Sequence, residues 1–347
     1  MRVELRGPGN CPPEWVTLTA ATTDFAVSGR WLETMGPLLP GQPRWLIGSV
    51  DGSPQVGLHA RLLETAPAEP RYDIGAVLRG EIPAFEPRSV PLSAFEPETL
   101  YPALLFVLPG YTCVPAGPGA ADPAVLGRTV EAVHDWARRH GIRSVSFLYV
   151  PERQRILRQA LTEFGARPVQ LYPTCVRPVD FADLDEYLGR LTRQRGRDLR
   201  RLLRRIDENG MVLGEDELSK VRDEVLELRL GLLRKYDSAA DRATQAATLD
   251  RMIRNYQPED RVVTTVRRDG RVVGFTLSLR HGDSLRVLWC GHEPDVYGTY
   301  FVMLFYELVA AALRRGINEI DYGTLKWQEK ISFGCRLEQL AGYTWTL

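Results

Sequence analysis

Apolar and polar positions alternate over several stretches of the first half of the chain, and this alternation predicts short strands. Residues 44–50 and 55–63 flank an Asp-Gly pair at 51–52, which is typical of a tight β-hairpin turn. Residues 28–39 predict a short amphipathic helix with Ser28 as its N-cap. The same patterns place further strands at residues 15–19, 104–108, 145–150 and 169–176, and helices at residues 123–140 and 152–164.

The second half begins with helical periodicity and then changes to the alternation of strands. Helices are predicted at residues 181–209, 218–236, 240–256 and 298–315, and strands at residues 261–267, 272–280, 285–290, 317–322 and 342–346. In the first half, residues 65–100 are rich in Pro, Glu and Ala and show little periodicity. We expect a long irregular insertion there.

Two segments of the first half return in the same order in the second half. WLIGSVDGSPQVGLHARLL matches VVTTVRRDGRVVGFTLSLR, and WARRHGIRSVSFLYV matches ALRRGINEIDYGTL. In this comparison Gly141 corresponds to Gly316, and Gly57 roughly to Gly274. Ordered self-similarity of this kind predicts a duplicated domain. We therefore expect an α/β protein with two domains, residues 1–178 and 179–347, each a mixed sheet with packed helices.

Composition and charge restrict the classes of function. The 347 residues are 44% hydrophobic and 25% charged, with a formal net charge of zero, so only a local patch can attract a polyanion. The five cysteines lack metal-ligand spacing and their number is odd, which predicts reduced thiols, a cytoplasmic location and no metal site. We expect neither a signal peptide nor a transmembrane helix, because the sequence has no suitable apolar run.

Groups capable of chemistry are concentrated near the end of the chain, in LRRGINEIDYGTLKWQEKISFGCRL. A helix stops at Gly316, a strand follows, and polar or reactive side chains come directly after it. The side chains of interest in this stretch are Asp321, Tyr322, Lys326, Trp327, Lys330 and Cys335. Open α/β sheets commonly keep their sites just past the C-terminal ends of strands, so we predict the site here.

The second half resembles the Fem-like branch of the GNAT acyltransferase superfamily, which includes proteins of peptidoglycan biosynthesis. The resemblance lies in YLGRLTRQRGRDLRRLLRRIDENG, LLRKYDS, RRDGRVVGFTLSLRHGD and GINEIDYGTLKWQEKISFGCRL. It extends over residues 185–340, and more weakly over residues 28–180. Because Fem-like proteins are tandem GNAT repeats, it implies two tandem GNAT-like domains. It also implies transfer of an acyl or aminoacyl group to an amine, from acetyl-CoA, an aminoacyl-tRNA or a carrier-protein thioester.

The sequence departs from the GNAT pattern where ordinary members bind the pyrophosphate of CoA. That loop corresponds to CGHEPDVYGTY here, in which Glu293 and Asp295 replace the usual basic residues. The matching residues 117–122 of the first half contain no basic residue either. Two carboxylates disfavour a pyrophosphate at a helix N-terminus. We therefore expect a donor carried on tRNA or on a carrier protein, and not free acetyl-CoA.

Four residues are candidates for catalysis. Lys326 and Lys330 are four apart, and the resemblance suggests a basic residue that stabilises a tetrahedral oxyanion, although solvated lysines explain the spacing equally. Asp321 is a candidate general base, or else a partner of an arginine or of a backbone turn. His292 has a side chain suited to proton transfer, or is structural. Cys335 is interpreted as a buried apolar cysteine and not as a nucleophile.

Two further groups of residues are predicted to bind ligands. Aromatic side chains near the predicted site are expected to contact a small-molecule amine, although the helical position of Tyr300 also suits a core residue: Trp289, Tyr297, Tyr300, Tyr322 and Trp327. One face of an arginine-rich helix is expected to bind tRNA phosphates or an acidic carrier protein: Arg193, Arg197, Arg200 and Arg204. A solvated face paired with Asp198 and Asp207 is the alternative.

The hypothesis is acyl or aminoacyl transfer to an amine, in natural-product or cell-wall biosynthesis. One alternative is a GNAT scaffold that performs elimination or intramolecular cyclisation on a tethered natural-product intermediate. The other is an inactive binding subunit that accompanies a partner enzyme. The first alternative consumes no free donor, and the second predicts no turnover but stable co-purification with an enzyme.

Overall fold

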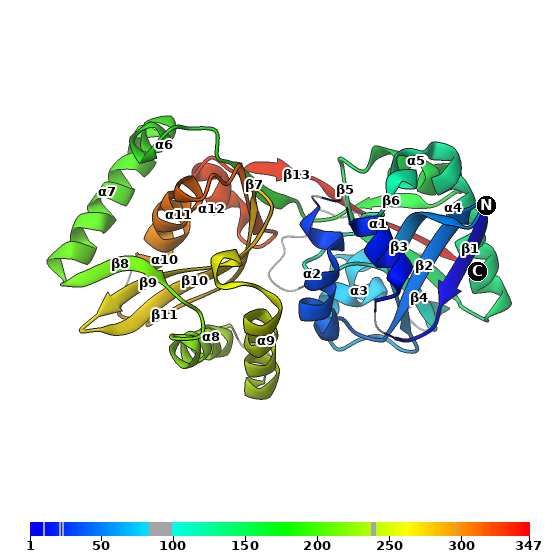
Figure 1. The fold of residues 1–347 in the computed structure, drawn as a ribbon, viewed down its shortest axis with the longest axis horizontal. Coiled ribbons are helices and arrows are strands. Elements are labelled where there is room, and N and C mark those ends of the chain that lie inside the picture. The colour runs from blue at the N-terminus through cyan, green and yellow to red at the C-terminus, as the bar shows by residue number, and fades with distance from the viewer. Residues whose placement is uncertain (10, 21, 23, 83–98, 237–240, 297) are drawn as a thin grey trace. The chain divides into compact units, whose positions relative to one another are not determined.

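The computed structural model describes all residues except 10, 21, 23, 83–98, 237–240 and 297 (Figure 1). The chain divides into two compact units. Unit 1 contains Met1–Pro173 together with Glu338–Leu347, and unit 2 contains Thr174–Leu337. The last ten residues thus group with the first unit, whereas the domain division expected from the sequence kept them in the second half.

Unit 1 is built on a seven-stranded mixed sheet in the order β1-β2-β3-β4-β5-β14-β6. All neighbouring strands are antiparallel except β4 and β5. The strands are β1 (Arg2–Arg6), β2 (Gln42–Val50), β3 (Ser53–Leu63), β4 (Ala103–Phe106), β5 (Ser144–Pro151), β6 (Arg167–Gln170) and β14 (Leu340–Thr346). The helices are α1 (Pro13–Thr19), α2 (Gly29–Met35), α3 (Ile74–Arg79), α4 (Pro123–Arg139) and α5 (Arg155–Glu163), with 3-10 turns at Phe25–Val27, Gly36–Leu38, Pro70–Tyr72 and Pro118–Ala121.

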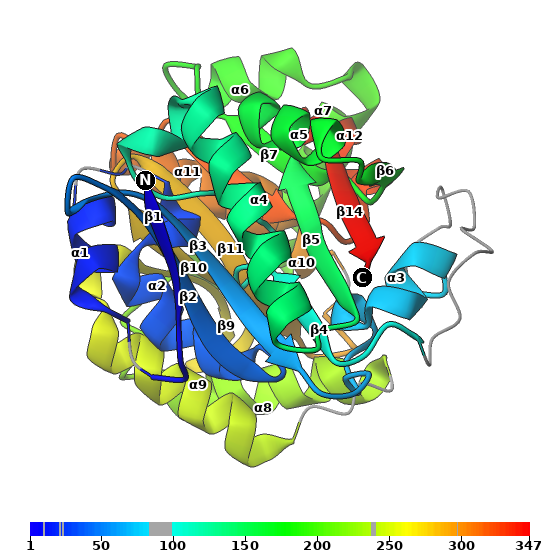
Figure 2. The same ribbon diagram turned by 90° about the vertical axis from the view of Figure 1, so that its right-hand side faces the viewer.

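Both faces of this sheet are covered, because alternate residues of its central strands enter two different cores. Phe106 and Phe147 pack against α4 and α5 on one face (Figure 2). Their neighbours Leu105 and Leu148 enter the core that includes Ile74 and other residues of α3. Two-sided burial explains why β4 and β5 read as continuous apolar runs.

Unit 2 is built on a second seven-stranded sheet in the order β13-β7-β12-β11-β10-β9-β8. The strands are β7 (Thr174–Pro178), β8 (Met211–Asp216), β9 (Arg261–Arg268), β10 (Arg271–His281), β11 (Ser284–His292), β12 (Glu319–Gly323) and β13 (Arg336–Glu338). The helices are α6 (Leu184–Arg190), α7 (Arg193–Glu208), α8 (Arg222–Lys235), α9 (Arg242–Asn255), α10 (Thr299–Val302), α11 (Leu308–Arg314) and α12 (Trp327–Ser332). A 3-10 turn lies at Pro258–Asp260, and a π-helical segment, Met303–Glu307, joins α10 to α11.

The two sheets share one topology. Each has four antiparallel strands, then a single parallel pair, which is β4–β5 in unit 1 and β11–β12 in unit 2. The next strand is β14 in unit 1 and β7 in unit 2. β7 belongs to the sheet of unit 2 but directly follows β6 of unit 1 in the chain. β14 belongs to the sheet of unit 1 but directly follows β13 of unit 2. The predicted duplication is confirmed, and this exchange explains why residues 338–347 belong to unit 1.

Some predicted elements are wrong in type or extent. Residues 15–19 form part of α1 and not a strand, because Trp15 and Leu18 are buried at helical spacing and Pro13 occupies the first turn. Residues 181–209 form two helices, since Thr192 caps a new helix by accepting a hydrogen bond from Arg195 N. The strand predicted at residues 169–176 is divided between β6 and β7, which lie in different sheets.

The predicted insertion at residues 65–100 is only partly irregular. It contains a 3-10 turn and the helix α3, which Asp73 caps through Gly75 N. Residues 83–98 lie outside the described residues. In the part of the chain that the structure describes, every helix is too short or too polar to cross a bilayer.

Candidate functional site

The parallel strands of unit 2 separate after a short pairing. Three residues of β11, Ser284 to Arg286, pair with Glu319 to Asp321 of β12. Beyond this point β11 continues to His292 with β10 on one side, and within the described chain residues 287–292 have no pairing with β12. A bulge opposite Leu277 and Ser278 interrupts the register of β11 in the same region. Backbone groups of β11 are therefore left unpaired on the β12 side.

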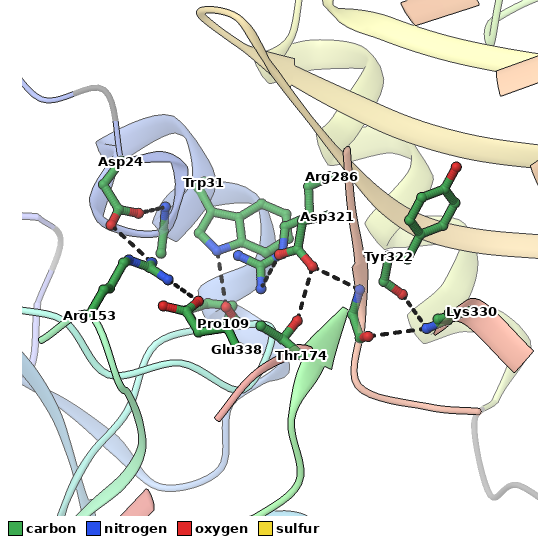
Figure 3. A network of polar contacts seen from close by, with 12 residues as sticks. Asp24, Trp31, Pro109, Arg153, Thr174, Arg286, Asp321, Tyr322, Lys330 and Glu338 are labelled. Carbon is green, nitrogen blue, oxygen red and sulfur yellow. Dashed lines mark hydrogen bonds and ion pairs between the residues drawn. The ribbon is translucent and has the colours of Figure 1, made fainter. Parts of the chain in front are cut away.

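Asp321 is the last residue of β12 that pairs with β11, opposite Arg286 (Figure 3). Its carboxylate forms an ion pair with Arg286 at 3.4 Å and accepts hydrogen bonds from Thr174 Oγ1 at 3.1 Å and from Gly323 N at 2.8 Å. These partners lie on β11, on β7 and at the end of β12, so one carboxylate ties three strands together. The contacts correspond to the alternative in which Asp321 pairs with an arginine and a backbone turn, and they favour a positioning role.

Lys330 lies on α12 and is buried, with 5% of its surface exposed. Its ammonium donates hydrogen bonds to the carbonyl oxygens of Tyr322, at 2.5 Å, and Gly323, at 3.1 Å (Figure 3). Burial lowers the pKa of Lys330. An ammonium has three N–H donors, and the third has no hydrogen-bond partner among the described residues. Lys330 thus fixes the end of β12 and keeps one donor available.

Lys326 differs from Lys330 in exposure and in backbone conformation. It is exposed, and its ammonium lies 5.9 Å from the centre of the Tyr236 ring. It precedes α12 in the left-handed region, with φ 52° and ψ 44°. This conformation costs a residue other than glycine about 1 kcal/mol or more. A lysine at a position suited to glycine is the kind of local strain that accumulates at functional sites.

Cys290 lies on the part of β11 that β12 does not pair. Burial raises the pKa of its thiol, and the positive charges of Arg229, Lys330 and Lys326 act in the opposite direction. The half-buried Tyr300, on α10, also has its pKa raised, by burial first and then by Cys290. Side chains from α8, α10 and α12 therefore gather beside the unpaired edge of β11. Neither Cys290 nor Arg229 was among the predicted site residues, because no motif links residues so far apart in the chain.

Two other predicted residues, His292 and Tyr322, lie at the far end of β11 and in the core of unit 2. His292 follows Arg286 by six positions, roughly 20 Å along a strand, so it does not meet Asp321. Its Nδ1 lies 2.8 Å from the carbonyl oxygen of Glu293. Tyr322 is buried in the core and donates a hydrogen bond to the carbonyl oxygen of Leu304 at 2.8 Å. A core position explains Tyr322 without a substrate.

The remaining aromatic candidates divide between the core and the vicinity of the site. Trp289 is buried, with the Arg229 guanidinium 5.2 Å from the centre of its ring. Trp327 and Tyr300 are half-buried beside the core of unit 2. Tyr297 lies outside the described residues. Cys335 is buried, and burial raises its pKa to about 12, so its thiol is neutral near pH 7.

The loop after β11 is held by its own partners. Glu293 forms ion pairs with Arg268 at 3.0 Å and with Arg271 at 2.7 Å, and Asp295 pairs with Arg268 at 2.9 Å. The β9–β10 hairpin thus supplies positive charge that the loop's own sequence lacks. Gly298 has φ +88°, and a Cβ added there would lie 2.4 Å from a methyl group of Leu202 on α7. Close packing by α7 leaves this glycine no room for a side chain.

The arginine face of α7 points away from the core. Its buried side consists of Gly196, Leu199, Leu202 and Ile206. All four arginines predicted on the opposite face are exposed: Arg193, Arg197, Arg200 and Arg204. In the described part of the chain, no three His, Cys, Asp or Glu side chains group as metal ligands would.

Comparisons with known proteins agree with this architecture. The model of a family described as an acetyltransferase (GNAT) domain matches residues 192–330. The structure of FemX, at 12% identity and a TM-score of 0.63, aligns over 99% of this chain and 97% of that one. The structure of L-PGS from Bacillus licheniformis, at 11% identity and a TM-score of 0.59, aligns over 97% of this chain and 92% of that one. A tandem GNAT protein from the clavulanic acid biosynthesis pathway, at 11% identity and a TM-score of 0.52, aligns over 99% of this chain and 98% of that one.

These findings define the class of fold. The second half of the chain carries a GNAT domain, and the whole chain has the fold of a tandem GNAT protein. Within that class, the likeness to FemX places it with the Fem-like tandem proteins in fold. No curated protein matches the chain in sequence.

Proposed function

We propose that the protein transfers an acyl or aminoacyl group to an amine, and that the reaction takes place in unit 2 beside the unpaired edge of β11. The observation that carries the proposal is the separation of β11 from β12 directly after Arg286 and Asp321, with two lysines at the end of β12. An unpaired strand edge can bind an extended donor arm through backbone hydrogen bonds. The transferase fold supports the same chemistry.

The chemistry requires little from the protein beyond positioning and charge. The acceptor ammonium gives one proton to water, and its nitrogen attacks the carbonyl carbon of the donor ester or thioester. The tetrahedral oxyanion then collapses, the bond to the donor oxygen or sulfur breaks, and that atom takes up a second proton from the acceptor nitrogen as an amide forms. Lys326 is the group assigned to the oxyanion, because its ammonium is exposed and its backbone is strained. The third N–H of Lys330 is the second candidate donor.

The other predicted residues receive more limited roles. Asp321 acts as a positioning residue through Arg286 and Thr174, and not as the base. His292 lies at the far end of the unpaired edge of β11, too far along the strand to act together with Asp321. Tyr300 and Trp327 are proposed to contact the acceptor, since both are half-buried. Trp327 begins α12, and Tyr300 lies close enough to Glu329 of α12 for its charge to raise the tyrosine pKa.

A donor carried on tRNA or on a carrier protein is proposed in place of free acetyl-CoA. Glu293 and Asp295 already pair with Arg268, and Leu202 of α7 packs against Gly298, so the loop offers a pyrophosphate neither free cations nor open space. A biosynthetic role, in the cell wall or in a natural product, is part of the proposal, with the clavulanic acid pathway protein as its precedent in fold. The five free cysteines support a cytoplasmic location.

The experiment offers three labelled donors to the purified full chain: bulk aminoacyl-tRNA, an acylated carrier protein and acetyl-CoA. The acceptor is a fraction of small amines from cell extract, and mass spectrometry detects labelled amides. We expect a product with one of the two carried donors, lost in Lys326→Ala and kept in the surface variant Lys220→Ala. Product from acetyl-CoA alone would overturn the choice of donor. Turnover without donor consumption, or an enzyme that co-purifies with an inactive chain, would replace the proposal by one of its two rivals.

A further inference from the structure

The outward face of α7 carries a row of arginines whose charge the rest of the protein does not neutralise. Seven arginines and three acidic residues lie between Arg193 and Glu208, in a chain whose formal net charge is zero. We propose that this row binds the phosphodiester backbone of RNA. The choice of RNA over DNA rests on the proposed function, whereas the binding of a nucleic-acid backbone rests on the surface itself.

The arginines form a nearly straight row along the helix. Arg193, Arg197, Arg200 and Arg204 are spaced by three or four residues, so successive guanidinium groups advance by about 4.5–6 Å and the row spans roughly 17 Å. The residues on the opposite side of α7 are buried in the core of unit 2. All four side chains are therefore directed to solvent at once, as repeated contacts with a strand of phosphates require.

Many arginines of unit 2 have acidic partners, but the four arginines of this row do not. Arg267 pairs with Asp216, and Arg315 pairs with Glu215. Within the described residues, Arg193, Arg200 and Arg204 form no ion pair, and Arg197 donates only to the amide oxygen of Gln194. Nearby on the helix, Arg201 has Asp198 as a partner. The surface therefore presents cations available for an external anion.

The chemistry of the row favours a nucleic acid over a protein or a membrane. A stable protein interface needs an apolar centre, and no large apolar side chain of α7 is exposed. A helix that binds a membrane inserts its apolar face into lipid, and the apolar face of α7 is already buried in the core of unit 2. Evenly spaced cations without apolar neighbours match the sequence-independent part of nucleic-acid binding.

The row is also physically linked to the proposed reaction centre. At one end of α7, the Arg195 guanidinium lies 5.4 Å from the centre of the Phe333 ring, directly after α12. Further along, Leu202 packs against Gly298 at the start of α10. RNA aligned with α7 would therefore direct one end toward α12, where Lys326 and Lys330 lie. This geometry suits an RNA that presents an acyl group at its end.

The test uses fluorescently labelled deacylated bulk tRNA and the full chain, with binding measured by anisotropy from 50 to 300 mM salt. Binding of four phosphates to the wild type predicts a slope of log K against log salt of roughly −3. In Arg197→Glu/Arg200→Glu we expect affinity at 50 mM salt to fall at least tenfold and the slope to become shallower by about 1.5. The charge-matched control, Arg128→Glu/Arg138→Glu on the exposed side of α4, should stay within twofold of the wild type.

Each outcome decides the proposal. Equal losses in both variants would show a general charge effect and overturn it, as would unchanged binding in the α7 variant. Circular dichroism and the milder Arg197→Gln/Arg200→Gln variant guard against misfolding, with a smaller loss in the same direction expected. Arginine-dependent binding of an acidic carrier protein without tRNA binding would also overturn it. Because no acyl group is transferred in this assay, its failure leaves the proposed transfer reaction to be judged separately.

Discussion

The two units share a topology but differ at the place where their parallel strands separate. In unit 1, the chain after β4 turns back and fills this place: Cys113 N donates to the carbonyl oxygen of Tyr149 at 3.0 Å, and Ala116 forms a bridge with Gly57. In unit 2, the described residues leave the corresponding edge of β11 unpaired, and the neighbouring side chains include Lys326, Lys330 and Cys290. A duplicated fold thus has one position that the chain itself fills and one strand edge that the described residues leave unpaired.

The segment of unit 1 that follows β4 and fills the place beside β5 is apolar and closely packed. Cys113, Val114 and Ala116 are each buried, with at most 2% of their surface exposed. His59, on β3, is buried beside this segment, and its Nδ1 lies 2.8 Å from the carbonyl oxygen of Val107. The comparison supports the proposal that the reaction takes place in unit 2.

The largest expected effect distinguishes Lys326 from surface charge in general. Lys326→Ala should lower turnover about 10²–10³-fold, the loss typical of removing one oxyanion donor, with the free energy of unfolding unchanged or slightly higher. Steady-state transfer from the active donor measures it, with Lys220→Ala as the matched surface control. Equal turnover in Lys326→Ala and Lys220→Ala would remove Lys326 from the reaction.

The second prediction tests how unit 1 keeps its position filled. Burial lowers the pKa of His59 to about 4 from its ordinary 6.5, so stability from neutral His59 is complete above pH 6.5 and is lost as pH falls toward 4. The linked loss is about 3 kcal/mol over that range. Urea unfolding at pH 7 and pH 4.5 should show a smaller pH-dependent loss in His59→Gln than in the wild type. The same loss in both proteins would exclude His59 as its source.

The third prediction concerns the end of β12. Lys330→Met keeps the length of the side chain but leaves the carbonyl oxygens of Tyr322 and Gly323 without their donor. We expect the free energy of unfolding to fall by about 2 kcal/mol, the cost of unsatisfied buried carbonyls less the relief of a buried charge. Denaturant titration measures this loss, and Lys220→Met serves as the exposed control. A stability equal to that of the control would mean that these bonds do not hold the strand.

The smallest expected effect is an increase in the free energy of unfolding. Lys326→Gly removes the strain at φ 52°, which outweighs the greater freedom of glycine in the unfolded chain. We expect stability to rise by about 0.5–1 kcal/mol while activity falls as in Lys326→Ala. Thermal unfolding alongside the transfer assay measures both quantities. A variant that is less stable than the wild type would contradict the assignment of strain.

Local patterns in the sequence predicted much of this comparison. The Asp-Gly hairpins and the two glycine-terminated helices were sufficient to reveal the duplication, which the shared sheet order confirms. The placement of Asp321, Lys326 and Lys330 around one strand end also followed from their spacing. These features depend on residues close together in the chain.

Contacts between distant segments could not be predicted in this way. The exchange of β7 and β14 depends on pairing with β12 and β5, which no local pattern records. The two carbonyl partners of Lys330 and the charges around Cys290 likewise arise only when α12 and β11 come together. The sequence therefore predicted that these side chains lie around one strand end, but it did not distinguish the lysine that holds the strand from the one that is exposed.

Hydrogen–deuterium exchange with each of the three donors compares the two equivalent positions in one sample and so shows which unit binds the donor. We expect fast exchange of unpaired amides in residues 287–292 of the free protein, and protection there when aminoacyl-tRNA or an acylated carrier protein is added. Residues 107–116 of unit 1 should be protected throughout. Protection that appears in residues 107–116 while residues 287–292 do not respond to any donor would move the binding site to unit 1 and overturn the proposed function.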